Sequence, residues 1–218
     1  MLTRTWSTVL FDMDGTIIDS APGILEALAH MHESMGLSIP SEPELMSWIG
    51  PPILDSMRER AGLSGASSAR ALQVYRDYYR PSAAQAPVFP GVAGVLEQVH
   101  AAGIPIALAT SKPETVAVEI LRAAGLLDYF SVTVGASEDE QRSAKADVVG
   151  EALRRLEASG VDLSAPVMVG DRLHDTEGAS AHGVPTILVE WGYGGPHEAD
   201  DALAVVHSAD GLRALLLG

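Results

Sequence analysis

The chain contains no cysteine among its 218 residues. Disulfide bridges, cysteine-bound zinc and thiol nucleophiles are therefore excluded. Residues 1–8 also lack the charged-then-apolar pattern of a secretory signal, and no apolar run approaches the ~20 residues that span a bilayer. These absences predict a soluble protein without a membrane partner, and we expect it to be cytoplasmic.

Positive charge is scarce. The chain has 14 Lys and Arg residues against 29 Asp and Glu residues, which gives a formal net charge of -15 at pH 7. Because clustered cations are what bind nucleic-acid backbones and anionic membranes, this balance argues against both as partners. A small anionic substrate is still allowed, since a bound metal ion reverses the sign of the field locally.

Lysine is the scarcest charged residue. Only Lys112 and Lys145 are present, and the other 12 basic residues are arginine. The strong preference for arginine over lysine, together with abundant alanine and glycine, reflects the base composition of the gene rather than function. Against that background, the two lysines indicate positions where arginine could not replace lysine. A compact ammonium meets a carboxylate and a phosphate in a tight site, whereas a planar guanidinium is too wide.

What the chain does have is a repeated rhythm of short apolar runs and helix-sized segments. We predict five strands, each continuously apolar as in a parallel sheet buried on both faces, at 8–11, 105–109, 132–134, 167–169 and 186–189. Helices are predicted between and after them, at 91–102, 113–124, 145–159, 175–182 and 210–217. This alternation predicts an α/β fold with a doubly wound, Rossmann-like parallel sheet.

One segment breaks the alternation. Between Ile17 and Phe89 we find only helical patterns, at 20–35, 42–48, 53–61 and 67–79. We therefore predict a core domain of residues 1–16 and 90–218 and an inserted, all-helical cap domain of residues 17–89. Ligands of open parallel sheets bind outside the carboxyl ends of the strands, and an insert directly after the first strand would lie over that edge.

Two acids, Asp12 and Asp14, close the first predicted strand. Side chains two apart on a strand share a face, so both carboxylates point the same way. Two anions held together are costly unless a cation joins them. Taken alone, the pattern Asp-x-Asp-Gly is mostly typical of a simple turn at Asp14-Gly15.

Two further strands end in the same kind of chemistry. Thr110 and Ser111 close the second strand, where hydroxyls hold a phosphate oxygen or cap the next helix. Asp171 follows the fourth strand and Asp175 lies one helical turn later, where each acid either caps a helix or binds Mg²⁺ through a hard oxygen. Each feature has an ordinary structural explanation, but three such strand ends out of five predict a shared site.

In order and placement these residues resemble the four motifs of the haloacid dehalogenase (HAD) superfamily. The matching segments are Asp12-Met13-Asp14-Gly15-Thr16, then Thr110, then Lys145, then residues 170–175. The helical insert resembles the first cap class (C1) of that superfamily. Residues 89–91 and 110–113 resemble phosphoglycolate phosphatase-like members. The resemblance spans essentially the whole chain, and it is specific for phosphotransfer rather than for a substrate.

The resemblance implies a Mg²⁺-dependent phosphomonoester hydrolase that acts on a small phosphorylated metabolite. Asp12 would attack phosphorus and become an aspartyl-phosphate. Asp14 would protonate the leaving oxygen and then activate water. The other implied roles are charge neutralisation by Lys145, phosphate binding by Thr110, Ser111 and Gly15, and Mg²⁺ binding by Asp12, Asp14 (through its backbone carbonyl), Asp171 and Asp175.

Other reactions are weighed on the same residues. Dehalogenases of the superfamily lack the second aspartate, so Asp14 argues against them, and phosphonatases need a cap lysine, which residues 17–89 lack. A β-phosphoglucomutase-like phosphomutase and a nucleoside 5'-monophosphate phosphatase stay open. A receiver-type phospho-Asp signalling module is disfavoured by the Asp-x-Asp spacing and by the helical insert.

The predicted cap loop, residues 48–54, carries no charge. A cap that reads a second phosphate would be expected to place a cation there, which disfavours the mutase. Arg58 and Arg60 follow the loop, and we expect them to be surface charges of a helix. For the quaternary state we expect a monomer or a weak homodimer.

Overall fold

The computed structural model describes residues 6–218, so residues 1–5 of the predicted core domain lie outside the described part of the chain. Within this part, one parallel sheet has the strand order β3-β2-β1-β4-β5-β6. The strands are β1 (Thr8–Phe11), β2 (Ile106–Pro113), β3 (Val132–Ala136), β4 (Pro166–Gly170), β5 (Thr186–Val189) and β6 (Ala204–Val206). The predicted doubly wound α/β fold is confirmed.

The five predicted strands are all present, and the sheet has one strand more. β6 pairs with β5 at the edge of the sheet, where Val205 is exposed and Ala204 is half-buried. It therefore lacks the continuous apolar run by which the other strands were predicted. β2 is longer than predicted, because it continues through Thr110 to Pro113.

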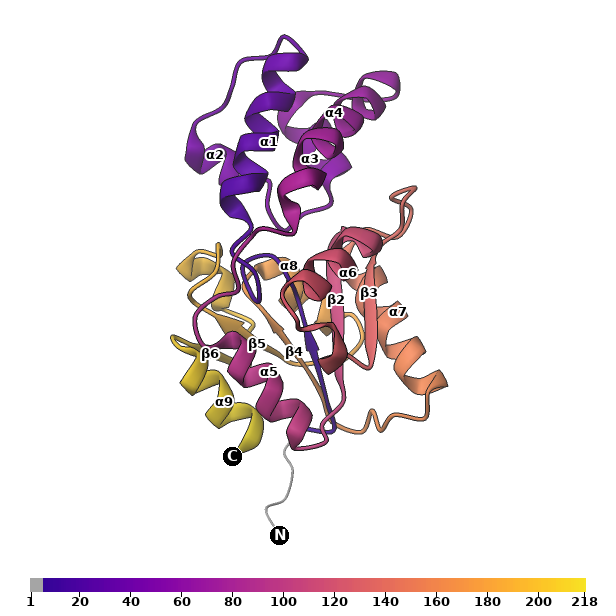
Figure 1. Cartoon of the computed structure of the whole chain (residues 1–218), viewed down its shortest axis with the longest axis vertical. Coiled ribbons are helices and arrows are strands. Elements are labelled where there is room, and N and C mark those ends of the chain that lie inside the picture. The colour runs from indigo at the N-terminus through magenta and orange to yellow at the C-terminus, as the bar shows by residue number, and fades with distance from the viewer. Residues whose placement is uncertain (1–5) are drawn as a thin grey trace.

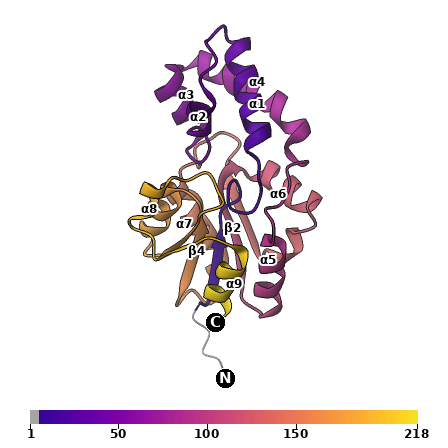
Figure 2. The same cartoon turned by 90° about the vertical axis from the view of Figure 1, so that its left-hand side faces the viewer.

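Helices cover both faces of the sheet (Figure 2). α5 (Val92–Ala101), α6 (Glu114–Ala123) and α9 (Ala209–Leu217) pack on the face that carries Val9 and Phe11. α7 (Lys145–Ala158) and α8 (Leu173–Ser180) pack on the opposite face, against Leu10 and Met168. β1 is fully buried at the centre of this arrangement, so the residue that follows it starts from a fixed position.

The helical segment after β1 lies above the carboxyl ends of the strands (Figure 1). It consists of α1 (Ala21–Ser34), α2 (Glu42–Met46), α3 (Ile53–Ala61) and α4 (Ala66–Ala83). Its two connections to the sheet run side by side, since Ile18 pairs with Val88 in an antiparallel bridge. The division of the chain into domains at residues 16/17 and 89/90 stays a prediction.

Among residues 6–218, every helix is too short or too polar to cross a membrane.

Candidate active site

The site begins where the strand order reverses. β1 and β4 are neighbours in parallel register, with Phe11 opposite Val169, and the N–H of Asp12 donates to the carbonyl oxygen of Val169 (2.9 Å). The chain therefore leaves both strands at the same edge. In doubly wound sheets, the crevice at such a reversal is the usual place for a ligand.

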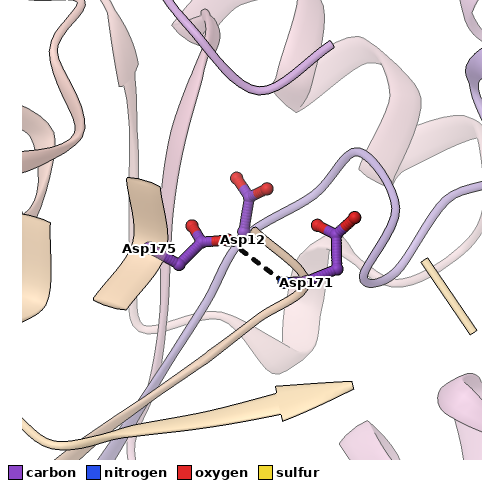
Figure 3. Close-up of side chains that lie close together, drawn as sticks. All are labelled: Asp12, Asp171 and Asp175. Carbon is purple, nitrogen blue, oxygen red and sulfur yellow. Dashed lines mark hydrogen bonds between the residues drawn. The ribbon is translucent and has the colours of Figure 1, made fainter. Parts of the chain in front are cut away.

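Three buried acids meet at this edge. Asp12, Asp171 and Asp175 each offer a carboxylate oxygen, and these three atoms lie within 4.8 Å of one another. The three side chains come from the end of β1, the turn after β4 and the first turn of α8 (Figure 3). The structure therefore brings together three of the four acids predicted for the site.

Backbone and side-chain donors hold the two later acids. Asp175 Oδ2 accepts the N–H groups of Asp171 (3.1 Å) and Arg172 (3.0 Å), which fixes it at the start of α8. Asp171 Oδ2 accepts the N–H of Tyr193 (2.7 Å), and its Oδ1 accepts the hydroxyl of Thr16 (3.3 Å). Hydrogen bonds within the protein thus position both acids.

Lys145 is the cation of this cluster. Its Nζ donates to Asp12 Oδ1 (2.6 Å) and to the carbonyl oxygen of Ala109 (3.2 Å), and it lies 2.7 Å from Asp175 Oδ1. Burial opposes the charged form, but Asp12 and Asp175 outweigh it and raise the pKa of Lys145. Lys145 is therefore a fixed positive charge between two carboxylates.

One lysine does not balance three acids. Burial is the main reason that the pKa of Asp12 is raised to about 6. The positive charge of Lys145 lowers this pKa, and the negative charge of Asp175 raises it. Burial, followed by repulsion from Asp175 and Asp12, raises the pKa of Asp171 well above its usual range. Buried anions that repel each other gain from a divalent cation, and carboxylate oxygens are hard ligands suited to Mg²⁺.

Glycines leave room around Asp171. A methyl group at Gly15 would lie 2.1 Å from Asp171 Oδ2, and one at Gly192 would lie 2.4 Å from the same oxygen. The second methyl would also lie 2.5 Å from the carbonyl oxygen of Gly15. Oxygen atoms thus line a cradle that any larger residue would fill, so the residues present fit a small cation.

The Gly15→Ala variant is expected to weaken Mg²⁺ binding by at least about 10-fold, the lower end of the effect seen when groups that orient metal ligands are changed. The added methyl displaces the Asp171 carboxylate, and the backbone at φ +82° disfavours alanine as well. Isothermal titration with Mg²⁺ measures the change.

Gly36→Ala is the matched control for Gly15→Ala. It imposes the same backbone strain at φ +68°, but no atom of the described residues lies within 4 Å of the added methyl. Equal Mg²⁺ affinity in both variants would contradict the role of the space at Gly15.

Asp14 has a separate environment from the three-acid cluster. Its Oδ2 lies 3.2 Å from Lys112 Nζ, and Lys112 donates to the hydroxyl of Tyr79 on α4 (3.0 Å). Burial opposes the charged form of Lys112, but Asp14 and the neighbouring tyrosines raise its pKa. Each lysine of the chain therefore contacts one acid of the first motif: Lys145 contacts Asp12, and Lys112 contacts Asp14.

The predicted phosphate-binding residues lie at the same edge but are not equivalent. Ser111 Oγ is buried, and it has no hydrogen-bond partner in the described part of the chain. Thr110 Oγ1 accepts the N–H of Lys112 (3.3 Å), which leaves its own hydroxyl hydrogen available. The N–H of Gly15 donates to the carbonyl oxygen of Ile18 (3.0 Å), so this N–H is engaged in the turn.

A cavity of about 110 Å³ lies between the helical segment and Asp12 and Asp14. Its walls are mainly apolar and aromatic, and include Trp48, Ile49, Ile53, Leu72, Tyr75 and Val116. Arg58 does not reach it, because this residue is exposed and pairs with Asp55 (2.6 Å) on α3. The cavity gives a substrate access to the two acids at the end of β1.

Three contacts of the site were missed by the sequence analysis. Tyr79 reaches Lys112 from the helical segment, Tyr193 holds Asp171, and Glu140 lines the cavity. The glycine-rich stretch around Tyr193 was the available signal, since closely spaced glycines indicate an approach of backbone to another group. Glu140 carried no signal.

The comparisons with known proteins agree with this geometry. Residues 9–189 match the family model described as haloacid dehalogenase-like hydrolase. Over 213 residues the chain is 40% identical to the tyrosine-protein kinase PtkA of Mycobacterium tuberculosis, covering 95% of this chain and 72% of the relative. Over 218 residues it is 34% identical to a phosphoglycolate phosphatase of Cupriavidus necator, covering 96% and 93%.

A solved structure is similar over nearly the whole chain. The crystal structure of a predicted phosphatase from Clostridium acetobutylicum superposes with a TM-score of 0.89 at 30% identity, covering 96% of this chain and 97% of the other. The chain belongs to the haloacid dehalogenase-like hydrolase family. Within that family it is a phosphatase, as the resemblance implied.

Proposed function

We propose that the protein is a Mg²⁺-dependent phosphomonoester hydrolase that acts on a small phosphorylated compound through an aspartyl-phosphate at Asp12. One observation carries the proposal. Asp12 stands at the end of the central strand, 2.6 Å from the buried Lys145, and shares a cluster with Asp171 and Asp175. A phosphate dianion needs cations beside its acceptor carboxylate, and this cluster has one and fits a second.

Asp12 acts as the nucleophile in this mechanism. One oxygen of its carboxylate forms a bond to phosphorus while the bond from phosphorus to the ester oxygen breaks. Lys145 favours the ionised form of Asp12 and offsets charge that builds up on the phosphoryl group. Asp12, Asp171, Asp175 and the backbone carbonyl of Asp14 would hold Mg²⁺, which would supply electrostatic stabilisation of the phosphoryl oxygens when bound.

Asp14 moves the protons. It donates a proton to the departing ester oxygen, and the resulting carboxylate then takes a proton from the water that attacks the phosphorylated Asp12. Hydrolysis releases inorganic phosphate and restores both acids. Lys112 holds the Asp14 carboxylate in place through its contact at 3.2 Å. Ser111 and Thr110 donate hydroxyl hydrogens to the phosphoryl oxygens.

Mg²⁺ is expected to raise the melting temperature by roughly 5–10 °C near pH 7.5, and by less near pH 5, at a concentration of about 100 Kd. Raised pKa values at Asp12 and Asp171 mean that the metal-free native state binds more protons than the unfolded state between pH ~4 and ~6. The metal-free protein therefore loses stability as the pH rises through this window. Mg²⁺ binds the deprotonated carboxylates, so the rise in melting temperature that it causes becomes larger as the pH rises.

Thermal unfolding with EDTA or Mg²⁺ at the two pH values measures this. Asp171→Asn is expected to remove most of the Mg²⁺ effect. Asp210→Asn, which changes an acid that is 94% exposed on α9, is expected to keep it. A Mg²⁺ effect that is equal at both pH values would contradict the shared carboxylate site.

Transfer of phosphate to a tyrosine, the activity in the name of the mycobacterial relative, is the second candidate. The 40% identity favours it. A nucleoside triphosphate brings several negative charges, however, and the cations that line the cavity are already paired with carboxylates. We therefore rank hydrolysis first.

A phosphate-release assay with 4-nitrophenyl phosphate tests the proposed function. With Mg²⁺ we expect steady release of phosphate, and with EDTA we expect that release to stop. Labelled ATP with a tyrosine peptide is measured in parallel. Label on the peptide without hydrolysis of any ester would favour the second candidate.

A further inference from the structure

The cations around the cavity determine whether it can bind an anionic group of a substrate. In the described part of the chain, Lys112, Arg76 and Arg80 line the cavity. Each is paired with a carboxylate: Lys112 with Asp14 (3.2 Å), Arg76 with Glu140 (2.6 Å) and Arg80 with Glu119 (3.0 Å). The first two pairs are largely buried, so their charges are little screened.

Two further acids lie on the cavity wall. Glu138 and Glu140 both line it, and among residues 6–218 no group forms a hydrogen bond with the buried Glu140 Oε2. The backbone of Glu140 has φ +58°, which is uncommon for a residue other than glycine, and Arg76 from α4 closes over its other oxygen. An anionic group on the substrate would meet these acids with no unpaired cation beside it.

The remaining wall is apolar. Trp48, Ile49 and Ile53 come from the loop and helix that follow α2, and Leu72 and Tyr75 come from α4. The volume of about 110 Å³ is somewhat below the ~150 Å³ of an engineered cavity that holds benzene in another protein. The cavity is therefore small, and its apolar walls favour a compact apolar or aromatic group over a charged one.

We propose that this cavity selects phosphate monoesters of compact apolar or aromatic alcohols that carry no second anionic group, an inference that rests on the proposed function. Selection works by rejection. A carboxylate beside the ester would have to break the buried pair between Arg76 and Glu140 or lie against Glu138 and Glu140 unpaired. Esters such as 2-phosphoglycolate, whose alcohol carries a carboxylate, are thus poor substrates.

A second opening lies beside α3 and the start of α7. It has a volume of about 420 Å³, and Lys145 and Arg60 line it. Asp55, Glu59 and Glu177 line it too, and Arg60 is exposed to solvent. The acids outnumber the cations there, so this opening does not favour a second anion either.

Matched pairs of esters test the proposal on the full-length protein with Mg²⁺. Phenyl phosphate is compared with 4-carboxyphenyl phosphate, and ethyl phosphate with 2-phosphoglycolate. We expect kcat/KM to be at least about 30-fold higher for the uncharged member of each pair, as for sites that leave a buried charge unpaired. A carboxylate ester that is hydrolysed as fast as its partner or faster overturns the proposal.

Variants identify the cause of the discrimination. In Glu140→Gln the guanidinium of Arg76 loses its carboxylate, so activity toward the carboxylate esters is expected to rise by about 10-fold relative to the uncharged ones. Glu97→Gln, an exposed acid on α5 away from the cavity, is the matched control and is expected to keep the wild-type ratio. An unchanged ratio in a folded Glu140→Gln variant overturns the role of Glu140.

Two further measurements distinguish a failure of this inference from a failure of the proposed function. If Glu140→Gln does not fold, the wild-type ratio is measured between about 0.05 and about 0.5 M salt, where a ratio set by buried charges is expected to stay nearly constant; a ratio that falls toward one at high salt overturns the proposal. Arg60→Ala is expected to leave the ratio of the two kcat/KM values unchanged. A loss of activity in this variant that affects only the carboxylate esters overturns the proposal. If no ester is hydrolysed at all, the proposed function fails and the inference fails with it.

Discussion

The Asp12→Asn variant is expected to lose at least about 10⁴-fold in kcat, because removing a nucleophile abolishes the covalent route and leaves only residual effects of binding and electrostatics. Asparagine has nearly the same shape as aspartate but cannot form the acyl phosphate. The neighbouring Lys145 keeps its contact with Asp175 (2.7 Å), so the site is expected to stay assembled. Steady-state hydrolysis of 4-nitrophenyl phosphate with Mg²⁺ measures the loss.

Stability decides how the loss of activity in Asp12→Asn is read. The variant removes one of three mutually repelling buried carboxylates, so its melting temperature without metal is expected to equal or exceed that of the wild type. Asp147→Asn, which changes an exposed acid in the first turn of α7, is the matched control and is expected to keep full activity. An Asp12→Asn protein that is folded and active would rule out Asp12 as nucleophile.

Lys145→Met is expected to have the second largest effect, on activity and stability together. Without this cation, Asp12 and Asp175 are buried without a positive partner, and breaking a buried pair in this way costs about 3–5 kcal/mol. The drop in kcat is expected to reach about 10³-fold, since the nucleophile and the phosphate both lose a fixed positive charge. Urea unfolding without metal and steady-state kinetics with Mg²⁺ measure the two effects.

Lys145→Arg separates charge from shape. The side chain of Lys145 packs closely on α8, where a methyl group at Gly178 would lie 2.5 Å from its Cγ. A guanidinium is wider than an ammonium, so we expect a fall in kcat of about 10²-fold even though the charge is kept. Arg154→Met, which removes an exposed cation of the same helix, is expected to change neither quantity. Full activity in Lys145→Arg would contradict the sequence argument drawn from the scarcity of lysine.

The sheet was predictable from the sequence because its strands are buried on both faces. β1, for example, is apolar and buried at all four positions, so its pattern does not depend on knowing what packs against it. β6 was not predictable, since an exposed edge strand of three residues has no such pattern. The helices between residues 17 and 89 were predictable from the sequence, but their contacts with the sheet were not predictable.

The candidate site was predictable in part for a related reason. Parallel strands end at one edge, so residues that follow β1 and β4 must meet there whatever else the chain does. Asp12 and Asp171 lie together as this rule requires. The rule does not extend to contacts across separate elements. Tyr79 and Lys112 are 33 residues apart and meet only because α4 packs over the end of β2.

The measurement that tests the account most directly is rapid-quench kinetics of Asp14→Asn with 4-nitrophenyl phosphate and Mg²⁺. Nitrophenolate is a good leaving group and needs no proton, but hydrolysis of the aspartyl-phosphate still needs a base, so the intermediate is expected to accumulate. We predict a burst of about one equivalent of nitrophenolate, with mass spectrometry locating the phosphoryl group on Asp12. A phosphoryl group on any other residue, or wild-type turnover of Asp14→Asn without a burst, would contradict the account.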